Sequence, residues 1–279
     1  MRRNRFPHTT GQSLIISYRS RFLPAILLLF VLFSFWPGVS EASPDTVFVL
    51  QTDELPVGEQ VRSSGEKLIS QPYGFTRISS DLSHNMKIGH IAVHGFGSEG
   101  YEWVGSLVQL SEVYTNTFLY RYDWNGCPEE AAETLADGII ELFRESPGVE
   151  KLVIFGHSYG GLVVTFCASK LHLNIPIEIH AIAAPLAGYT RLFKNCTVAQ
   201  DRDGRIAFPT WENSVIYTQW RTQFQLDNAF RQFPEDPQES NLADSGIFLL
   251  PDTMDGRRLG HNWSITWVID EYLGIPHSP

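Results

Sequence analysis

The stretch "LVIFGHSYGGLVVTF", residues 152–166, places one serine between two apolar runs. The pentapeptide G-H-S-Y-G at its centre has the form G-x-S-x-G, which in a strand-turn-helix context presents the serine hydroxyl on a sharp bend. Glycines suit such a bend because strand and helix pack closely around a serine in a strained conformation. We therefore interpret Ser158 as a nucleophile, the alternative being a glycine-rich turn with no chemistry.

Two backbone amides are expected to face Ser158. The first amides of the helix that follows point toward developing negative charge, which makes the amide of Tyr159 one candidate. A second donor should come from the loop after an earlier strand. The segment "VHGFGSEG" fits this place, so Phe96 and Tyr159 are predicted to form an oxyanion hole. His94 is expected to have a structural role.

A serine hydroxyl needs a base to become a good nucleophile. In proteins with this kind of elbow the chain order is serine, acid, histidine, with the histidine after the last strand. Of the four histidines that follow Ser158, only His261 sits in a loop between an expected final strand and final helix. We predict His261 as the base, the alternative being a polar loop residue or helix cap.

The acid is predicted from its place between the serine and the histidine. Asp227 follows the expected strand "SVIYTQWRT" and has apolar neighbours that could bury it. Asp236 and Asp244 lie in a later polar loop and are the alternatives. Asp252 is a further candidate beside the histidine loop, and a serine-histidine dyad without an acid also stays open.

Short apolar segments alternate with helical patterns from Lys87 onward, which is typical of βαβ units and a mostly parallel sheet. Strands are expected over residues 87–96, 117–124, 149–155, 177–185, 214–222 and 246–251, and helices over 103–114, 128–146, 160–172 and 262–274. The segments 46–55 and 66–78 are expected to be antiparallel edge strands. Residues 186–213 show little periodicity and are expected to form an irregular insertion.

The motifs together resemble those of the α/β-hydrolase superfamily, in particular its lipase- and esterase-like members. The resemblance runs from about Lys87 to Leu273 and rests on "HGFG", "GHSYGG", "AAPLAG" and "GHN". The combination is most similar to lipase-like proteins related to GPI-inositol deacylases. It implies an α/β-hydrolase fold with a mostly parallel central sheet, helices on both faces and a small lid insertion.

The implied activity is hydrolysis of a small-molecule or lipid acyl ester by a serine hydrolase, through a Ser-His-Asp triad and an acyl-enzyme. An acyltransferase, amidase or thioesterase on the same triad, and a catalytically inactive binding protein, are the alternatives. No metal or organic cofactor is implied, and "DRDG" at 201–204 is interpreted as a turn. Several aromatic residues either line an apolar acyl pocket or pack the core: Phe96, Tyr101, Trp103, Trp124, Tyr159 and Tyr189.

The amino-terminal 42 residues are expected to be a secretory signal peptide, with one domain over residues 43–279. Basic residues precede the fifteen-residue apolar run Phe22–Trp36, and Ser40 and Ala42 form a small-residue exit. The run is short for a membrane span, which needs about 20 residues, but an uncleaved anchor is the alternative. We therefore expect an exported protein, periplasmic or secreted.

The charge of the chain also limits its partners. The chain carries a net charge of −10, and the leader holds five arginines and one glutamate, so the remainder carries −14. This acidic balance argues against nucleic acid as a partner. A transient membrane contact and the oligomeric state stay open. Three cysteines are too few for a disulfide framework, although Cys127 and Cys196 could pair in an oxidising compartment.

Overall fold

The centre of the fold is strand β5, Lys151–His157, whose side chains alternate between two buried layers. A computed structural model describes residues 47–144, 146, 148–212 and 214–277. Leu152 and Ile154 pack into the core on one face of the sheet, and Val153 and Phe155 pack into the core on the other. A strand buried on both faces reads as a continuous apolar run, which is why "LVIF" shows no polar alternation.

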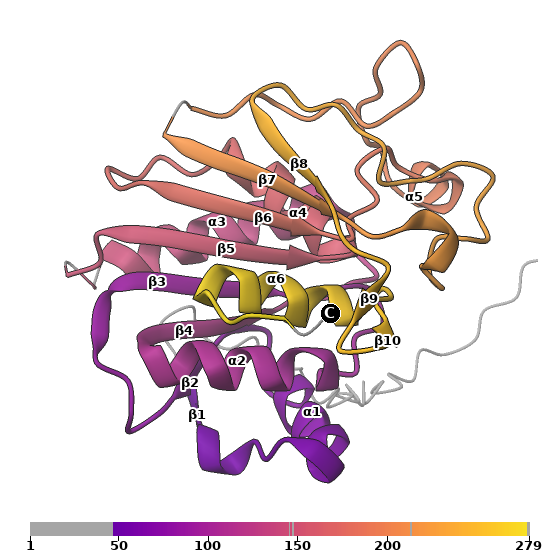
Figure 1. Cartoon of the computed structure of the whole chain (residues 1–279). Helices are drawn as coiled ribbons and strands as arrows, with labels where there is room; N and C mark the ends of the chain where they lie inside the picture. The colour runs from indigo at the N-terminus through magenta and orange to yellow at the C-terminus, as the bar shows by residue number, and fades with distance from the viewer. Residues whose placement is uncertain (1–46, 145, 147, 213, 278–279) are drawn as a thin grey trace, which may run out of the picture. The chain divides into compact units, whose positions relative to one another are not determined.

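Eight strands form the sheet in the order β1-β2-β4-β3-β5-β6-β7-β8 (Figure 1). Their bounds are β1 Phe48–Gln51, β2 Gly74–Ser79, β3 Asn85–Val93, β4 Tyr114–Arg121, β5 Lys151–His157, β6 Ile177–Ile182, β7 Val215–Arg221 and β8 Ser245–Leu249. Every neighbouring pair is parallel except β2 and β4, which are antiparallel. The expected mostly parallel sheet is confirmed.

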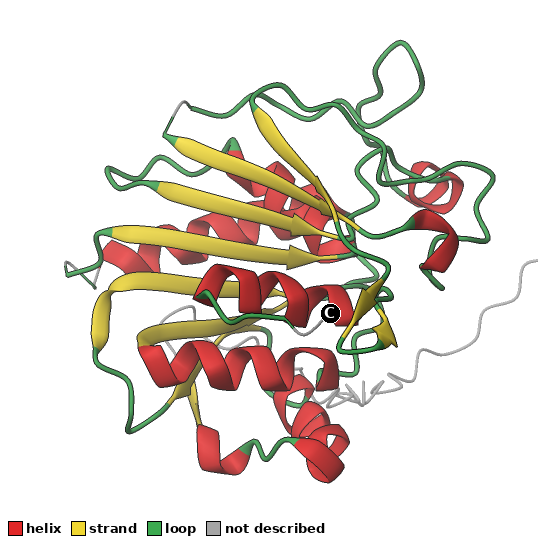
Figure 2. Ribbon diagram, viewed as in Figure 1, coloured by secondary structure: helices red, strands yellow, loops and turns green. Residues whose placement is uncertain are grey.

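Helices cover both faces of this sheet (Figure 2). Their bounds are α1 Val61–Ile69, α2 Tyr101–Val113, α3 Pro128–Arg144, α4 Tyr159–Ala168, α5 Thr190–Asn195 and α6 Trp263–Leu273. Apolar side chains of α3 and α4 form one core with the sheet, and those of α1, α2 and α6 form the other. The last helix ends at Gly274, whose φ of 71° is the left-handed conformation that glycine adopts at low cost.

The amino-terminal edge differs from the expectation of two antiparallel strands. β1 pairs parallel with β2, and only β2 runs antiparallel to its other neighbour. Residues 66–69, expected in a strand, belong to helix α1, and β2 begins only at Gly74. Gly65 allows α1 to pack closely on α2, because a Cβ there would lie 2.3 Å from the backbone nitrogen of Tyr101. This contact is tertiary, and strand-like local composition does not reveal it.

The insertion at residues 186–213 is less irregular than expected. It contains α5 and a bridge between Gln200 and Ile206. Asp201 accepts hydrogen bonds from the amides of Asp203 and Arg205 at 2.9 Å each, which makes "DRDG" a turn as predicted. A two-stranded hairpin, β9 Thr253–Met254 and β10 Arg257–Arg258, precedes the loop of His261 and was not expected.

The described residues belong to one compact unit. The predicted signal peptide, residues 1–42, lies outside the described residues. Across the part of the chain that the structure describes, no helix combines the length and the hydropathy that crossing a bilayer requires.

Two buried histidines lie away from the elbow, in the core under α6. The Nε2 of His90 lies 2.8 Å from the hydroxyl of Tyr272, and the Nδ1 of His180 accepts a hydrogen bond from the indole of Trp220 at 3.0 Å. Burial lowers the pKa of His90 to about 3 and that of His180 to about 4. Both rings are therefore neutral in the folded protein at neutral pH.

These histidines predict a loss of stability in acid. Below about pH 6.5 the unfolded chain protonates both rings while the folded protein does not, so the unfolded state binds more protons. The free energy of unfolding therefore decreases as the pH is lowered. Between its pKa in the unfolded chain and its pKa in the folded protein, each histidine adds up to about 1.4 kcal/mol per pH unit to the slope of the free energy of unfolding against pH. Urea unfolding between pH 7 and pH 4.5 should show that His90→Phe reduces the slope by this amount, and an unchanged slope would contradict the assignment.

Candidate active site

Ser158 sits at the junction of β5 and α4 in a strained conformation. Its φ of 55° and ψ of −121° lie in a region of backbone conformation that residues other than glycine rarely adopt. Such a residue costs about 1–3 kcal/mol and persists only where its surroundings hold it. Its amide donates to the carbonyl of Ile182 at 2.8 Å, and its own carbonyl accepts from the amide of Gly161 at 2.9 Å. The turn is therefore held from β6 and from the first turn of α4.

The glycines around Ser158 are required by close packing. A Cβ at Gly156 would lie 2.5 Å from the side chain of Val164. A Cβ at Gly160 would lie 2.3 Å from the carbonyl oxygen of Val93 and 2.5 Å from that of His94. The start of α4 thus contacts the end of β3 directly, with no room for a side chain between them.

Asp227 and His261 come together although 34 residues separate them. Asp227 follows β7 and is completely buried, and His261 precedes α6 with 14% of its side chain exposed. The Nδ1–H of His261 donates to Asp227 Oδ2 at 2.9 Å. This bond leaves Nε2 of His261 as the proton-accepting nitrogen. His261 and Ser158 line one cavity.

Asp227 is held as a carboxylate by three donors. Besides His261, the hydroxyl of Thr222 donates to Oδ2 at 2.5 Å and the amide of Ala229 donates to Oδ1 at 2.8 Å. Burial by itself raises the pKa of this carboxyl, but the hydrogen bonds and the nearby imidazole outweigh it, so the pKa lies below its usual 3.8. Asp227 is therefore ionised at neutral pH.

A second layer of contacts fixes Thr222. The side-chain oxygen of Gln238 accepts from the amide of Thr222 at 2.9 Å, and its Nε2 donates to the carbonyl of Thr222 at 3.2 Å. Asp236, an alternative acid, accepts from the amide and side chain of Gln238 at 3.0 and 3.1 Å. It contributes to the scaffold behind Asp227. Sequence reasoning missed Thr222 and Gln238, since only the end of an expected strand marked Thr222 and nothing marked Gln238.

The other sequence candidates lie elsewhere. Asp244 and Asp252 are exposed in loops. His180 lies within β6 against Trp220, and His172 pairs with Glu212 at 2.9 Å. The structure thus places Asp227, and neither of the exposed alternatives, in hydrogen-bond contact with the His261 ring.

His157 joins the elbow to the histidine loop. It is buried, and burial holds its pKa well below the usual 6.5, so the ring is neutral. Its Nε2 lies 3.1 Å from the carbonyl oxygen of His261, and an N–H at that position donates to it. The two rings lie 4.6 Å apart. The residue before the serine thereby fixes the loop that carries the base.

The candidate oxyanion donors flank Ser158. α4 begins at Tyr159, so the amide of this residue belongs to the first turn, which has no partner within the helix. Gly95 lies against the serine, because a Cβ at Gly95 would be 2.9 Å from the Cβ of Ser158. Phe96, the next residue, lines the cavity of Ser158 and is 49% exposed. His94 is buried against Tyr122, in keeping with the structural role expected for it.

Of the aromatic residues that the sequence suggested for an acyl pocket, Trp103 is fully buried and belongs to the core. Trp124, Tyr159 and Tyr189 line a second cavity together with Phe96. Among the described residues no group of three or more histidines, cysteines, aspartates or glutamates is placed to hold a metal ion.

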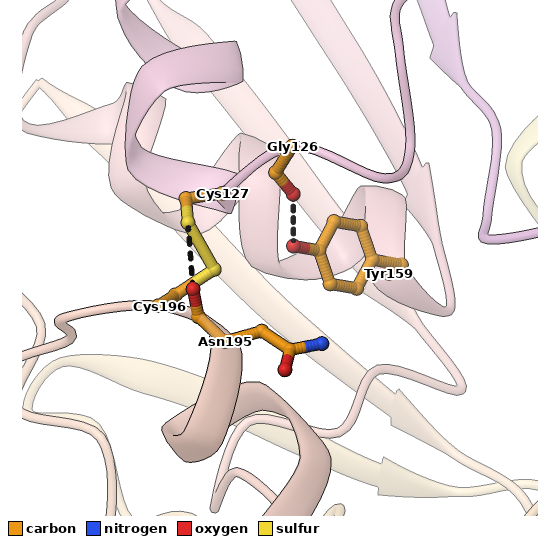
Figure 3. The surroundings of a disulfide bond; sticks show 5 residues. All are labelled: Gly126, Cys127, Tyr159, Asn195 and Cys196. Carbon is orange, nitrogen blue, oxygen red and sulfur yellow. Dashed lines mark hydrogen bonds between the residues drawn. A yellow bond between two sulfur atoms is a disulfide. The ribbon is translucent and has the colours of Figure 1, made fainter.

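A disulfide joins Cys127 to Cys196 beside this second cavity (Figure 3). It ties the loop before α3 to the end of α5 in the insertion. Next to it, the hydroxyl of Tyr159 donates to the carbonyl of Gly126 at 2.8 Å. The residue that follows the serine is thus anchored to the same loop that the disulfide holds.

Comparison with known proteins gives one family match. A family model described as the alpha/beta hydrolase family matches residues 91–276. No curated protein sequence matches the chain significantly.

The fold also resembles solved structures at low sequence identity. Est1E from Butyrivibrio proteoclasticus is 14% identical with a TM-score of 0.42, over 68% of this chain and 87% of that one. LpqC, a poly(3-hydroxybutyrate) depolymerase from Bordetella parapertussis, is 12% identical with a TM-score of 0.46, over 74% and 84%. A lipase-esterase related protein from Clostridium acetobutylicum is 12% identical with a TM-score of 0.43, over 72% and 98%.

The packing of Gly160 predicts opposite effects for two helical glycine substitutions. Gly160→Ala places a methyl group against two backbone carbonyls and should lower the free energy of unfolding by about 1–3 kcal/mol or more. Gly105→Ala in α2 meets nothing within 4 Å and should raise it by about 0.5–1 kcal/mol. Chemical denaturation of both variants checks this, and equal stabilities would show that α4 does not pack on β3 in this way.

Proposed function

The chain belongs to the alpha/beta hydrolase family, and on that premise we propose that it is a serine hydrolase of carboxylic esters. The observation that carries the proposal is the bond from His261 Nδ1 to the buried Asp227, beside a strained serine that lines the same cavity as the histidine. This is the arrangement in which a base is oriented by an acid and faces a nucleophile.

Acylation begins when the Ser158 hydroxyl attacks the ester carbonyl. His261 Nε2 takes the hydroxyl proton, and Asp227 stabilises the imidazolium that forms. The amides of Phe96 and Tyr159 are the proposed donors to the oxyanion, each worth about 3 kcal/mol of barrier. Collapse of the tetrahedral intermediate breaks the bond to the alcohol, which leaves with the proton from His261. Ser158 then carries the acyl group.

Deacylation repeats the same steps with water. His261 removes a proton from the water as it attacks the acyl-enzyme, and a second oxyanion forms at the same amides. Collapse breaks the bond to Ser158, whose oxygen takes the proton back from His261, and the carboxylic acid leaves.

We also propose that the protein is exported. The basic and apolar leader supports this, and the disulfide between Cys127 and Cys196 is an independent support because disulfides persist in oxidising compartments. An amino-terminal membrane anchor remains the alternative.

The nucleophile predicts a covalent label. Ser158→Ala should abolish reaction with a fluorophosphonate probe and lower esterase activity on the order of 10³-fold or more. Mass spectrometry of the labelled protein should place the probe on Ser158. Ser169→Ala, at the end of α4, is the matched control and should label and turn over normally. Esterase activity near wild type in the Ser158 variant would remove the proposal.

The acid predicts a loss of rate without a loss of structure. Asp227→Asn keeps the shape of the side chain but removes the charge that holds the His261 tautomer, so kcat should fall by about 10⁴-fold. Asp244→Asn is the control, since its φ of 57° suits asparagine and its side chain is exposed. Steady-state kinetics with circular dichroism would test both. A crippled Asp244 variant beside an active Asp227 variant would move the acid elsewhere.

A further inference from the structure

Phe96 stands between two cavities of different chemistry. The first, here called the histidine-side cavity, has a volume of about 130 Å³ and is lined by residues 95–99, 101–102, 157–158 and 261–262. The second, the insertion-side cavity, is lined by Phe96 together with residues 124–126, 159, 189, 191–192 and 195–196. The acyl part and the alcohol part of an ester need separate binding sites on the two sides of the nucleophile, and these two cavities are the candidates.

The position of His261 decides which half goes where. In the proposed mechanism His261 gives its proton to the departing alcohol, so the alcohol must lie within reach of this ring. His261 lines the histidine-side cavity, and the residues of the insertion-side cavity do not include it. On the proposed function, therefore, the histidine-side cavity receives the alcohol. The acyl group is left to lie toward the insertion-side cavity, which has a volume of about 50 Å³ and combines aromatic side chains with Asn125, Arg191 and Asn195.

The histidine-side cavity carries hydrogen-bonding groups with capacity to spare. The Nδ2 of Asn262 donates to the hydroxyl of Tyr101 at 3.1 Å, which leaves the Tyr101 O–H free to donate in turn. Ser98 donates to Glu102 Oε1. The other oxygen, Oε2 of Glu102, is buried and has no hydrogen-bond partner among the described residues. Burial raises the pKa of Glu102, which marks its carboxyl as poorly solvated.

A buried carboxyl oxygen that has lost its water and has no other hydrogen-bond donor destabilises the folded protein. A donor that reached Glu102 after a small rotation of the carboxyl would remove that cost. A bound alcohol that carries hydroxyl groups can supply the donor and at the same time accept from Tyr101. An alkyl group can do neither, and an ammonium group can only donate.

Charge and size narrow the ligand further. Arg62 pairs with Glu99 at 3.2 Å, so Glu102 is the acidic group of this lining that has no basic partner among the described residues, and its carboxyl disfavours a phosphate- or carboxylate-bearing leaving group. The volume lies well below the roughly 300–1,000 Å³ of sites for drug-sized ligands, so the group that enters is small.

We propose that the histidine-side cavity is the leaving-group site for a small polyhydroxy alcohol, and that Glu102 is its specificity-determining residue. The natural substrate is accordingly an ester whose alcohol part keeps free hydroxyl groups next to the ester bond. The proposal rests on the proposed function, since it takes the direction of proton transfer from it.

Two esters with the same acyl group test the proposal. Glyceryl 1-monobutyrate and n-propyl butyrate both release butyrate and both have three-carbon alcohols, but only the first keeps two hydroxyl groups. Titration of the released acid gives kcat/KM for each. We expect the wild type to prefer the glyceryl ester by about tenfold, the value of one well-made hydrogen bond of about 1.4 kcal/mol. A ratio near one would overturn the proposal.

Glu102→Gln isolates the residue, because it exchanges the Oε2 acceptor for a donor while keeping size and shape. The preference for the glyceryl ester should fall at least fivefold, mainly through KM, with propyl ester turnover within about twofold. Glu112→Gln, the same change at an exposed site on α2, should leave both unchanged. Equal losses on both esters would mean that Glu102 acts through His261, and would overturn the specificity role.

Failure of the proposed function would look different from failure of this inference. If the chain is not a serine esterase, neither butyrate ester is hydrolysed and Ser158 takes up no fluorophosphonate, and the leaving-group assignment falls with it. If both esters are hydrolysed at equal rates and Ser158 is labelled, the function stands and the leaving-group site alone is wrong.

Discussion

The contact between the first turn of α4 and the end of β3 constrains the rest of the site. Gly160 lies so close to the carbonyl oxygens of Val93 and His94 that no side chain fits between them. Because the helix starts this near the sheet, the chain must turn from β5 into α4 within one residue, and Ser158 takes the strained conformation that results. The loop after β3 is brought against the serine by the same contact.

His261 and Asp227, the proposed base and acid, lie in loops that follow the carboxyl ends of other strands. In a parallel sheet these ends meet at one edge, which is where α/β proteins place their ligands. Each loop is then fixed by buried polar contacts: His157 holds the backbone of His261, and Thr222 with Gln238 holds the acid. Buried hydrogen bonds of this kind hold the arrangement in place, so its geometry depends on residues other than the serine, the histidine and the aspartate.

The two cavities beside Ser158 differ in the residues that line them. On one side the disulfide and the hydroxyl of Tyr159 brace an aromatic wall that includes part of the insertion. On the other side polar and acidic groups surround His261. The disulfide between Cys127 and Cys196 ties the small insertion to the loop before α3. The shape of the aromatic side therefore depends on a covalent bond between two residues that lie 69 positions apart in the sequence.

The elements with a local signal could be predicted from the amino-acid sequence. Apolar periodicity predicted the parallel core of the sheet and its helices, and the glycine pattern around Ser158 predicted the elbow, because no other residue fits that packing. Tertiary structure decided the rest. It paired β1 parallel to β2 and made residues 66–69 helical against α2. It also placed Asp227, among the aspartates that sequence order left open, in hydrogen-bond contact with His261, and it brought Gln238 behind Thr222 and Glu102 into the cavity that Ser158 lines. Each of these depends on contacts between segments far apart in the chain, which neither periodicity nor motif spacing encodes.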